Sequence, residues 1–172
     1  KVGNAIINFG AASVDGISGA TPLAALKAGE SISLFDAFFG FTGGVIGETS
    51  AAMILLGAAY MVYRKVISLR IPLAYLLTFS VFVLLLGGHG FDFYFLACQL
   101  CTGGLMLGAF FMATDYVTSP ITKGGQIVFG ILLGILTGIF RFYGNNAEGV
   151  SYAIIIANLL VPLIEKMTMP RP

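Results

Sequence analysis

Five apolar segments follow one another after Leu34, each close to the length of about 20 residues that a bilayer core requires of a helix. They cover residues 43–63, 71–88, 91–113, 126–143 and 151–165. Polar side chains interrupt the first 35 residues too often for a span, among them Asn4, Asn8, Ser13, Lys27 and Glu30. We therefore predict an all-α membrane protein with a surface segment over residues 1–35 and a transmembrane helical domain over residues 36–172.

Composition strengthens the membrane prediction. Hydrophobic residues make up 58% of the chain and charged residues 10%, whereas soluble domains contain roughly 45–50% and 25%. The formal net charge is only +1, and the nine basic residues are spread along the chain instead of forming the basic patch that nucleic-acid binding requires. We expect an integral membrane protein in contact with the lipid bilayer, and we exclude nucleic acid as a partner.

The basic residues predict the orientation of the spans, because loops rich in Lys and Arg stay on the cytoplasmic side. Such residues lie between the first two predicted spans, between the third and fourth, and after the fifth: Arg64, Lys65, Arg70, Lys123, Lys166 and Arg171. These three regions are expected in the cytoplasm. The segment before the first span and the loops that contain His89 and Asn145 are then expected outside, with Lys27 and Arg141 as exceptions.

Glycine is abundant, at 23 of 172 residues, and it recurs at four-residue spacing. Residues four apart share one face of a helix, where glycine lets a neighbouring backbone approach closely. We predict helix-packing faces at these positions, with a substrate channel lined by bare backbone as the functional alternative. The positions are Gly130, Gly134 and Gly138, and the pairs Gly40/Gly44 and Gly104/Gly108.

The stretch that carries chemistry is residues 15–23, Asp-Gly-Ile-Ser-Gly-Ala-Thr-Pro-Leu. Its small residues leave the backbone bare and favour an irregular loop, and Pro22 restricts Thr21 to an extended conformation. Thr21 therefore presents its hydroxyl to an approaching enzyme without bulky neighbours. These properties alone indicate only a turn beside a membrane.

The sequence Ser18-Gly19-Ala20-Thr21, with Asp15 upstream, resembles the flavinylation motif of bacterial respiratory proteins. In that motif, a Mg²⁺-dependent flavin transferase moves FMN from FAD onto the threonine as a phosphoester, which here implies covalent FMN at Thr21. The other motif residues would surround the attachment, with Ser18 as the competing acceptor and Asp15 orienting the loop or the metal. The transferase works outside the cytoplasm, which agrees with the orientation that the basic residues predict.

The resemblance extends along almost the whole chain. The matching segments are Gly47-Glu48-Thr49-Ser50, Tyr63-Arg64-Lys65 to Arg70-Ile71-Pro72, Met112-Ala113-Thr114-Asp115, Glu148-Gly149-Val150-Ser151-Tyr152, and Asn158 to Glu165. Together they resemble the RnfD/NqrB family. RnfD is a membrane subunit of the Rnf complex, an ion-translocating ferredoxin:NAD oxidoreductase, and NqrB is its counterpart in the sodium-translocating NADH:quinone reductase. The end of the chain resembles RnfD more, although Tyr116 stands where the family has proline.

The family implies a fold, partners and a location. Its subunit has about ten spans in two related halves, and this sequence matches the second half, so we expect about five transmembrane helices forming one half of an inverted-repeat, urea-channel-like bundle. We expect the chain to be one part of a longer polypeptide. The other complex subunits and a flavin transferase are the implied partners, in the bacterial inner membrane with the flavin loop outside. The fold also admits a rival function, a solute or ion pore without redox chemistry.

Three ionisable residues near the predicted spans are further candidates for cofactor binding. Glu48 would contact a flavin or an ion, or instead satisfy free amide groups at a helix N-terminus. Asp115 would orient a second, non-covalent flavin such as riboflavin, or an ion entry, or simply end a solvated helix. Arg141 would reach the outer headgroups, or hold the FMN phosphate through paired hydrogen bonds.

The remaining polar residues carry less chemistry. Cys98 and Cys101 share a helix face, but two thiols do not complete a zinc or iron–sulfur site, so we predict packing and no metal. Asn158 is expected to hydrogen-bond a neighbouring helix. The sequence contains no catalytic triad, phosphate-binding loop or paired carboxylates. The chain is therefore not expected to be catalytic alone. The resemblance implies a subunit of a redox-driven ion translocase that acts as an electron relay, with the redox chemistry supplied by the flavin.

Overall fold

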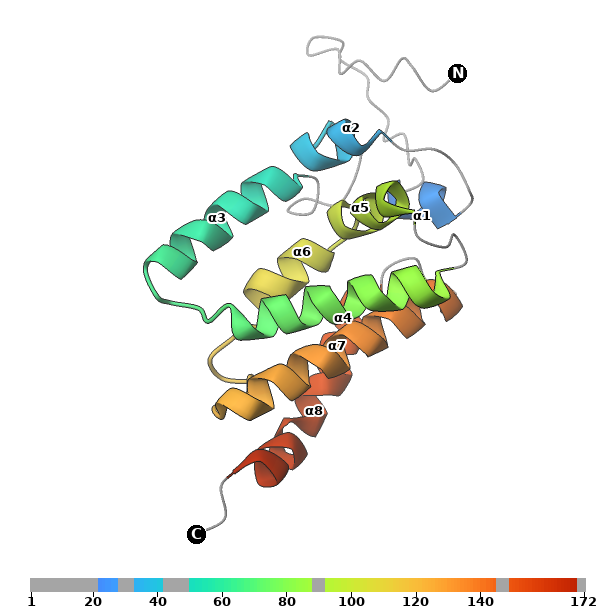
Figure 1. The fold of residues 1–172 in the computed structure, drawn as a ribbon. Helices are drawn as coiled ribbons and strands as arrows, with labels where there is room; N and C mark the ends of the chain where they lie inside the picture. Colours follow the sequence, from blue (N-terminus) through green and yellow to red (C-terminus); the bar gives the residue numbers. More distant parts are fainter. Residues whose placement is uncertain (1–21, 28–32, 42–49, 88–91, 145–148, 170–172) are drawn as a thin grey trace, which may run out of the picture.

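The computed structural model describes residues 22–27, 33–41, 50–87, 92–144 and 149–169, and the regular structure in these ranges is helical, as predicted (Figure 1). Two short helices, α1 (Pro22–Lys27) and α2 (Leu34–Phe39), precede the main bundle. The bundle consists of α3 (Ala51–Tyr63), α4 (Arg70–Leu86), α5 (Phe93–Cys101), α6 (Leu105–Leu107), the π-helical turn η1 (Gly108–Met112), α7 (Lys123–Tyr143) and α8 (Val150–Thr168).

Two of these helices are long and apolar enough to cross a bilayer, α7 with 21 residues and α8 with 19. A third crossing exists if α5 and the segment formed by α6 and η1 count as one bent span. α3 and α4 are also apolar but have only 13 and 17 residues. Since a helix rises about 1.5 Å per residue, α3 covers roughly 20 Å of a core about 30 Å thick. The structure therefore confirms two or three of the five predicted spans.

Polar side chains determine where several helices begin. Ser50 accepts a hydrogen bond from the Met53 amide at 3.4 Å and so caps α3, whose first residue is Ala51. Asp92 caps α5 in the same way, through the amide of Tyr94 at 2.9 Å. Such caps satisfy amides that have no partner within the helix. They account for the first residues of α3 and α5, Ala51 and Phe93.

The third predicted span is broken. We predicted one helix over residues 91–113, but the axes of α5 and of the α6–η1 segment differ by 69°. At the break, Thr102 is extended, with φ −98° and ψ 147°, and Gly103 has φ +69°. Glycine adopts that left-handed conformation without the clash of a Cβ atom. Apolar length alone did not reveal this interruption.

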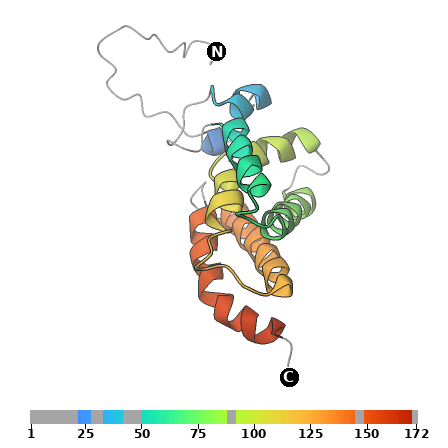
Figure 2. The same ribbon diagram turned by 90° about the vertical axis from the view of Figure 1, so that its left-hand side faces the viewer.

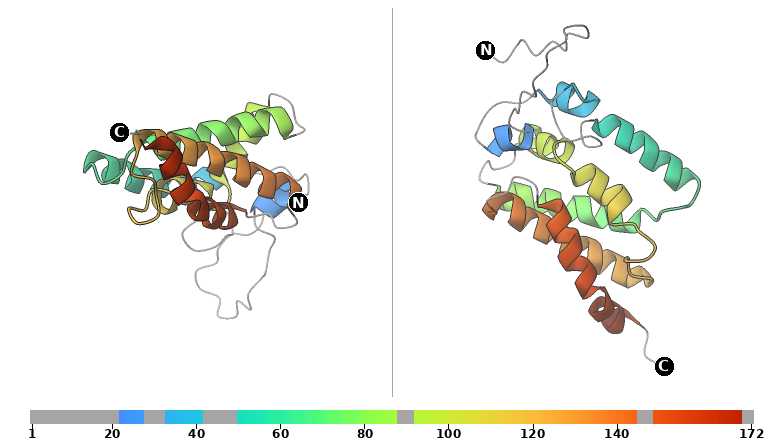
Figure 3. Two further views of the ribbon diagram at one scale, coloured as in Figure 1. Left: turned by 90° about the horizontal axis from the view of Figure 1, so that it is seen from below. Right: turned by 180° about the vertical axis from the view of Figure 1, so that it is seen from behind.

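α7 lies between α4 and α8 (Figures 2 and 3). Three of its glycines face α4. A Cβ at Gly130 would lie 2.7 Å from Ala74 Cβ, and one at Gly134 would lie 2.7 Å from Thr78 Cβ. These two backbones touch only because no side chain separates them. The predicted packing face of α7 is confirmed, whereas Gly40 has φ +91° and ends α2 instead of packing a helix.

The described residues separate a buried core from an apolar exterior. Tyr75 and Phe79 of α4 are fully buried against Phe129 and Leu133 of α7. On the outside of the bundle, large apolar side chains such as Leu159 are exposed. An apolar exterior is what a lipid environment requires. Together with the apolar helices, it indicates an integral membrane protein.

The regions predicted to share the cytoplasmic side meet at one end of the bundle. The Arg70 guanidinium donates to Gln126 Oε1 at 3.4 Å, and the Tyr116 hydroxyl donates to the Val66 carbonyl. At the same end, Glu165 in the last turns of α8 accepts from the Ile121 amide at 3.0 Å. These contacts join three regions: the turn between α3 and α4 from Arg64 to Arg70, here called the basic turn, the loop before α7, and the end of α8.

The two short N-terminal helices, α1 and α2, lie near α5. α1 begins at Pro22, a position where proline suits the start of a helix, so the predicted loop over residues 15–23 ends two residues early. α2 packs against α5 and α3. The predicted boundary between residues 35 and 36 falls inside α2. In Figure 1, α5 and α6 run between α3 and α4.

Candidate cofactor site at the broken helix

The break after α5 frees backbone carbonyls that a continuous helix would have used. Arg141, in the last turn of α7, supplies the missing donors. Its Nη1 donates to the Gln99 carbonyl at 2.5 Å and to Gln99 Oε1 at 3.2 Å, and its Nη2 donates to the Thr102 carbonyl at 3.2 Å. A guanidinium here also complements the negative C-terminal end of the α5 dipole.

Arg141 is buried, with 3% of its surface exposed. Its guanidinium carbon lies 5.2 Å from the ring centroid of Phe79, close enough for a cation–π contact. The expectation that Arg141 reaches the outer headgroups is therefore wrong. The freed carbonyls of α5 draw the charge inward, because an unsatisfied carbonyl inside the bundle is costly.

Apart from the Tyr75 hydroxyl on α4, the buried polar side chains among the described residues belong to α5, its end or α7: Gln99, Thr102, Thr137 and Arg141. Thr137 lies one turn before Arg141 and shares a hydrogen bond of 2.6 Å with the Tyr75 hydroxyl. Tyr75 in turn lies one turn before Phe79 on α4. The Thr137–Tyr75 and Arg141–Phe79 pairs lie in a row between α4 and α7, here called the polar seam, which ends at the broken helix.

α1 reaches this seam. A Cβ at Gly103 would lie 3.0 Å from Arg141 Nη2 and 3.0 Å from Leu23 Cδ2, so Leu23 and the guanidinium flank the same glycine. Leu23 itself is buried. Thr21 lies outside the described residues, but it is two positions before Leu23, and two residues span at most about 7 Å.

Of the predicted site residues, the structure describes only Asp115 and Arg141, and these two lie far apart. Asp115 is exposed in the loop before α7 and accepts a hydrogen bond from Thr118 Oγ1 at 3.3 Å. About 27 Å of α7 separates its first residue from Arg141, so these two side chains cannot contact one flavin. The other predicted residues lie outside the described part of the chain: Asp15, Ser18, Gly19, Ala20, Thr21 and Glu48.

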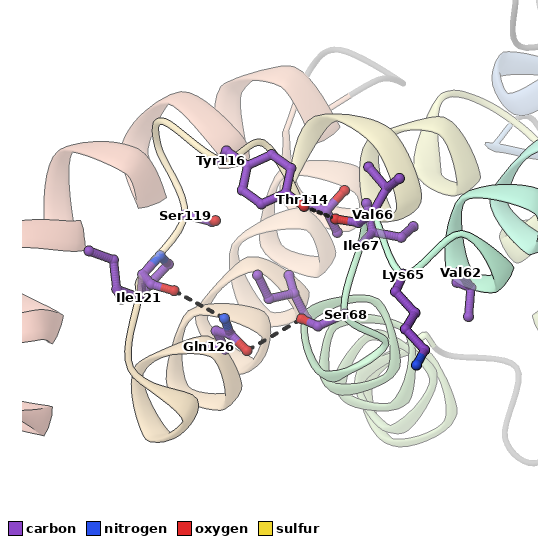
Figure 4. A pocket seen from close by; sticks show the side chains of 12 residues that line it. Val62, Lys65, Val66, Ile67, Ser68, Thr114, Tyr116, Ser119, Ile121 and Gln126 are labelled. Atoms are coloured by element: carbon purple, nitrogen blue, oxygen red, sulfur yellow. Dashed lines mark hydrogen bonds between the residues drawn. The ribbon is translucent and has the colours of Figure 1, made fainter.

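A cavity of about 490 Å³ opens beside Asp115, at the end where the basic turn lies (Figure 4). Thr114 and Tyr116 line it, whereas Asp115 between them does not. Ser68 Oγ donates to Gln126 Oε1 at 3.3 Å across the cavity wall, and Gln126 Nε2 donates to the Pro120 carbonyl at 3.3 Å. The predicted second flavin near Asp115 stays a prediction.

Comparison with known proteins identifies the family. The model of the NQR2, RnfD, RnfE family matches residues 4–172. The chain belongs to this family. It is 48% identical, over 162 residues, to the D-subunit of the Na⁺-translocating ferredoxin:NAD⁺ oxidoreductase complex of Acetobacterium woodii, and the match covers 91% of this chain and 49% of that protein.

Two further relatives in the NQR2, RnfD, RnfE family are similar over the same region. The D-subunit of the ion-translocating oxidoreductase complex of Stutzerimonas stutzeri is 40% identical over 179 residues, covering 94% of this chain and 49% of the relative. The D-subunit of the proton-translocating ferredoxin:NAD⁺ oxidoreductase complex of Clostridium ljungdahlii is 40% identical over 172 residues, covering 93% and 52%. The chain thus spans about half the length of these relatives.

Two smaller predictions for this family member have opposite outcomes. Cys98 is fully buried and Cys101 is partly buried, and neither forms a disulfide among the described residues, so the packing role of Cys98 is confirmed. Asn158 Oδ1 is buried but accepts no hydrogen bond from the described residues, so the interhelical bond predicted for Asn158 is wrong for that atom. α8 instead contacts its neighbours through small and apolar side chains such as Ala153 and Ala157.

The hydrogen-bond partners of Arg141 were not predicted from the sequence. Gln99 and Thr137 are polar residues inside predicted spans, which marks them as candidates for a buried network. Thr137 also lies four residues before Arg141 and so shares its helix face. These signals were present, but they do not say which residues of another helix complete the network.

Proposed function

We propose that this chain is part of the RnfD membrane subunit of an ion-translocating ferredoxin:NAD⁺ oxidoreductase and carries FMN covalently on Thr21 as an electron relay. The observation that carries the proposal is family membership combined with the motif Ser18-Gly19-Ala20-Thr21. The three relatives are each named as the D-subunit of an ion-translocating oxidoreductase complex. The other subunits and a flavin transferase are the proposed partners.

The geometry next to the motif supports the proposal. Leu23 is buried beside Gly103 and Arg141, so the attachment position is tied within two residues to the interior of the bundle. FMN, when bound, supplies the redox chemistry. The chain supplies position and charge: the Thr21 hydroxyl holds the phosphate, and the Arg141 guanidinium offsets its negative charge.

The proposal includes ion transport but does not specify the ion. One relative is named for Na⁺ and another for protons, so the proposed activity is translocation of a monovalent cation coupled to electron transfer. The same family includes NQR2, and the NqrB subunit of the sodium-translocating NADH:quinone reductase is the second candidate. The names of the relatives favour the Rnf complex.

Covalent flavin is tested by denaturing electrophoresis under ultraviolet light and by intact-mass measurement of the subunit. We expect a fluorescent band and an FMN adduct, both lost in Thr21→Ala and both absent when the protein is produced without a flavin transferase. Ser18→Ala is the matched control and should keep the adduct. An unmodified Thr21 in the assembled complex would contradict the proposal and favour a pore without redox chemistry.

The proposed orientation has Thr21 outside and the basic turn inside. It rests on the positive-inside rule and on the contacts that join the basic turn to the loop before α7. An impermeant maleimide added to intact cells should label Ser13→Cys but not Val117→Cys, whose parent side chain is 88% exposed at the other end. Both substitutions are made in a Cys98→Ala, Cys101→Ala background. The reverse labelling pattern would refute the orientation.

A further inference from the structure

An aromatic cavity lies between α2 and α5, apart from the polar seam. Its volume is about 550 Å³, within the usual range for sites that hold small organic ligands. Both helices contribute aromatic rings to its walls, and the polar groups are few. The lining residues are Ser33, Leu34, Phe35, Phe38, Phe39, Tyr94, Ala97 and Cys101.

The aromatic rings of α2 are held in place by one another and by α5. The ring centroids of Phe35 and Phe39 are 4.6 Å apart, and those of Phe38 and Phe39 are 5.3 Å apart in an edge-to-face arrangement. The Tyr94 hydroxyl accepts a hydrogen bond from the Leu34 amide at 3.2 Å, which joins the first residue of α2 to α5. The result is an apolar slot with a hydroxyl at its edge, which matches a flat heterocycle with polar edge atoms.

The cavity is linked to the flavin attachment position by one chain of contacts. Cys101, at the end of α5, lines the cavity, and Gly103, two residues later, is the glycine against which Leu23 packs. Leu23 is two residues after Thr21. The two residues from Cys101 to Gly103 and the two from Leu23 to Thr21 each span at most about 7 Å, and the contact of Leu23 with Gly103 joins these two steps.

We propose that the cavity between α2 and α5 receives the isoalloxazine ring of the FMN attached to Thr21, with Phe35, Phe38 and Tyr94 against the ring. This inference rests on the proposed flavinylation and names the part of the chain that holds the reactive ring. The phosphate end lies toward Gly103 and Arg141, and the ring end lies toward α2. The principal competitor for such a surface is a lipid acyl chain, since exposed aromatic side chains also gather at membrane interfaces.

The main test uses the full-length subunit in its assembled complex and compares two phenylalanines that are similarly exposed. Phe35→Leu removes a ring that lines the cavity, and Phe93→Leu removes one at the start of α5 that does not; the parent rings are 62% and 69% exposed, so neither change should unfold the protein. Collisional quenching of the covalent flavin by iodide is measured. A ring contact of the usual strength biases occupancy by roughly twofold to tenfold, so quenching should rise in Phe35→Leu and stay at the parent level in Phe93→Leu.

A second arm uses Cys101 as a reporter from inside the cavity. In a Cys98→Ala background, alkylation of Cys101 by N-ethylmaleimide is compared between the flavinylated complex and the Thr21→Ala complex. If the ring occupies the cavity, Cys101 should react several-fold more slowly when FMN is attached. Adding or removing phospholipid during the reaction distinguishes a lipid occupant, which would protect Cys101 equally with and without FMN.

The outcomes separate the two proposals. If the subunit carries no FMN adduct, the proposed function fails. If the adduct is present but iodide quenching is equal in Phe35→Leu, Phe93→Leu and the parent, and Cys101 reacts equally with and without FMN, the ring lies elsewhere and only this inference is overturned. Protection of Cys101 by lipid alone would also overturn it.

Discussion

The contact between α4 and α7 and the break between α5 and α6 are stabilised in opposite ways. Lipid offers no hydrophobic drive for helices to associate, so they must gain contact either by close packing or by satisfying polar groups. α7 meets α4 over glycines, with Gly134 so close that a Cβ would lie 2.9 Å from the Tyr75 carbonyl oxygen. The end of α5 is instead held by the buried guanidinium of Arg141.

The difference predicts how each region fails. Backbone atoms cannot move aside for a new side chain, so the glycine face tolerates no added bulk. The broken helix depends on a few hydrogen bonds, so it should weaken by the strength of those bonds while the rest of the bundle stays folded. Substitutions in the glycine face should therefore destabilise the bundle strongly. Substitutions at the break should cost less stability and act locally.

The largest effect is expected from Gly134→Leu. The new side chain would have to displace α4 from α7, at a cost of about 3 kcal/mol or more. Gly124→Leu is the matched control, because a Cβ at Gly124 meets only Thr168, at 4.0 Å. Thermal unfolding of the purified protein in detergent should show a large loss of stability for the first variant and little change for the second. Equal melting temperatures would show that the glycine face is not a close contact.

A smaller and more local effect is expected from Arg141→Gln. The Gln99 and Thr102 carbonyls would lose their donor, which costs roughly 1–3 kcal/mol for buried groups. Hydrogen exchange should accelerate in α5 and α6 more than in α4. Arg64→Gln is the control, because Arg64 is exposed at the end of α3. If exchange rises evenly over the whole bundle, Arg141 does not act specifically on the break.

The same Arg141→Gln variant also tests the role of the charge toward the flavin. Attachment depends on the motif, so the FMN adduct should be retained. Removing a nearby positive charge disfavours the anionic reduced flavin, so the midpoint potential of the covalent flavin should become more negative. A redox titration of the flavin absorbance measures this, with Arg64→Gln for comparison. A potential equal to that of the parent would limit Arg141 to the helix break.

The smallest effect is expected at the hydrogen bond between Tyr75 and Thr137. Thr137→Val keeps the shape and removes the hydroxyl, at a cost of roughly 0.5–1.5 kcal/mol. Tyr75→Phe should cost a similar amount, and the double variant should cost less than the sum of the two because both remove one interaction. Melting temperatures of the four proteins test this. Full additivity would mean that the two hydroxyls do not interact.

The sequence predicted the parts of this protein that depend on local pattern. Four-residue spacing of Gly130, Gly134 and Gly138 identified the packing face of α7, because helical periodicity depends only on residues along one helix. The apolar segments located α7 and α8, since crossing a bilayer is a matter of length and polarity. The motif around Thr21 predicted covalent flavin, which stays a prediction.

Other features depended on contacts that no local pattern encodes. The segment over residues 91–113 has the length and polarity of one span, yet it breaks where Thr102 and Gly103 leave the helix. Other glycines lie inside a continuous helix, as Gly134 does in α7. A buried helix can break at a glycine only where hydrogen-bond donors from elsewhere in the fold bind the carbonyls that the break frees.

Arg141 shows the division most clearly. Its sequence position determined that a positive charge stands near the end of an apolar helix, which requires some compensation. Only the tertiary structure decided what compensates it, because the Gln99 carbonyl comes from a residue 42 positions away. That partner becomes available only when α5 ends early and α7 passes beside it. Burial and hydrogen bonding in this protein are properties of the assembled bundle, whereas helix length and packing periodicity belong to the sequence.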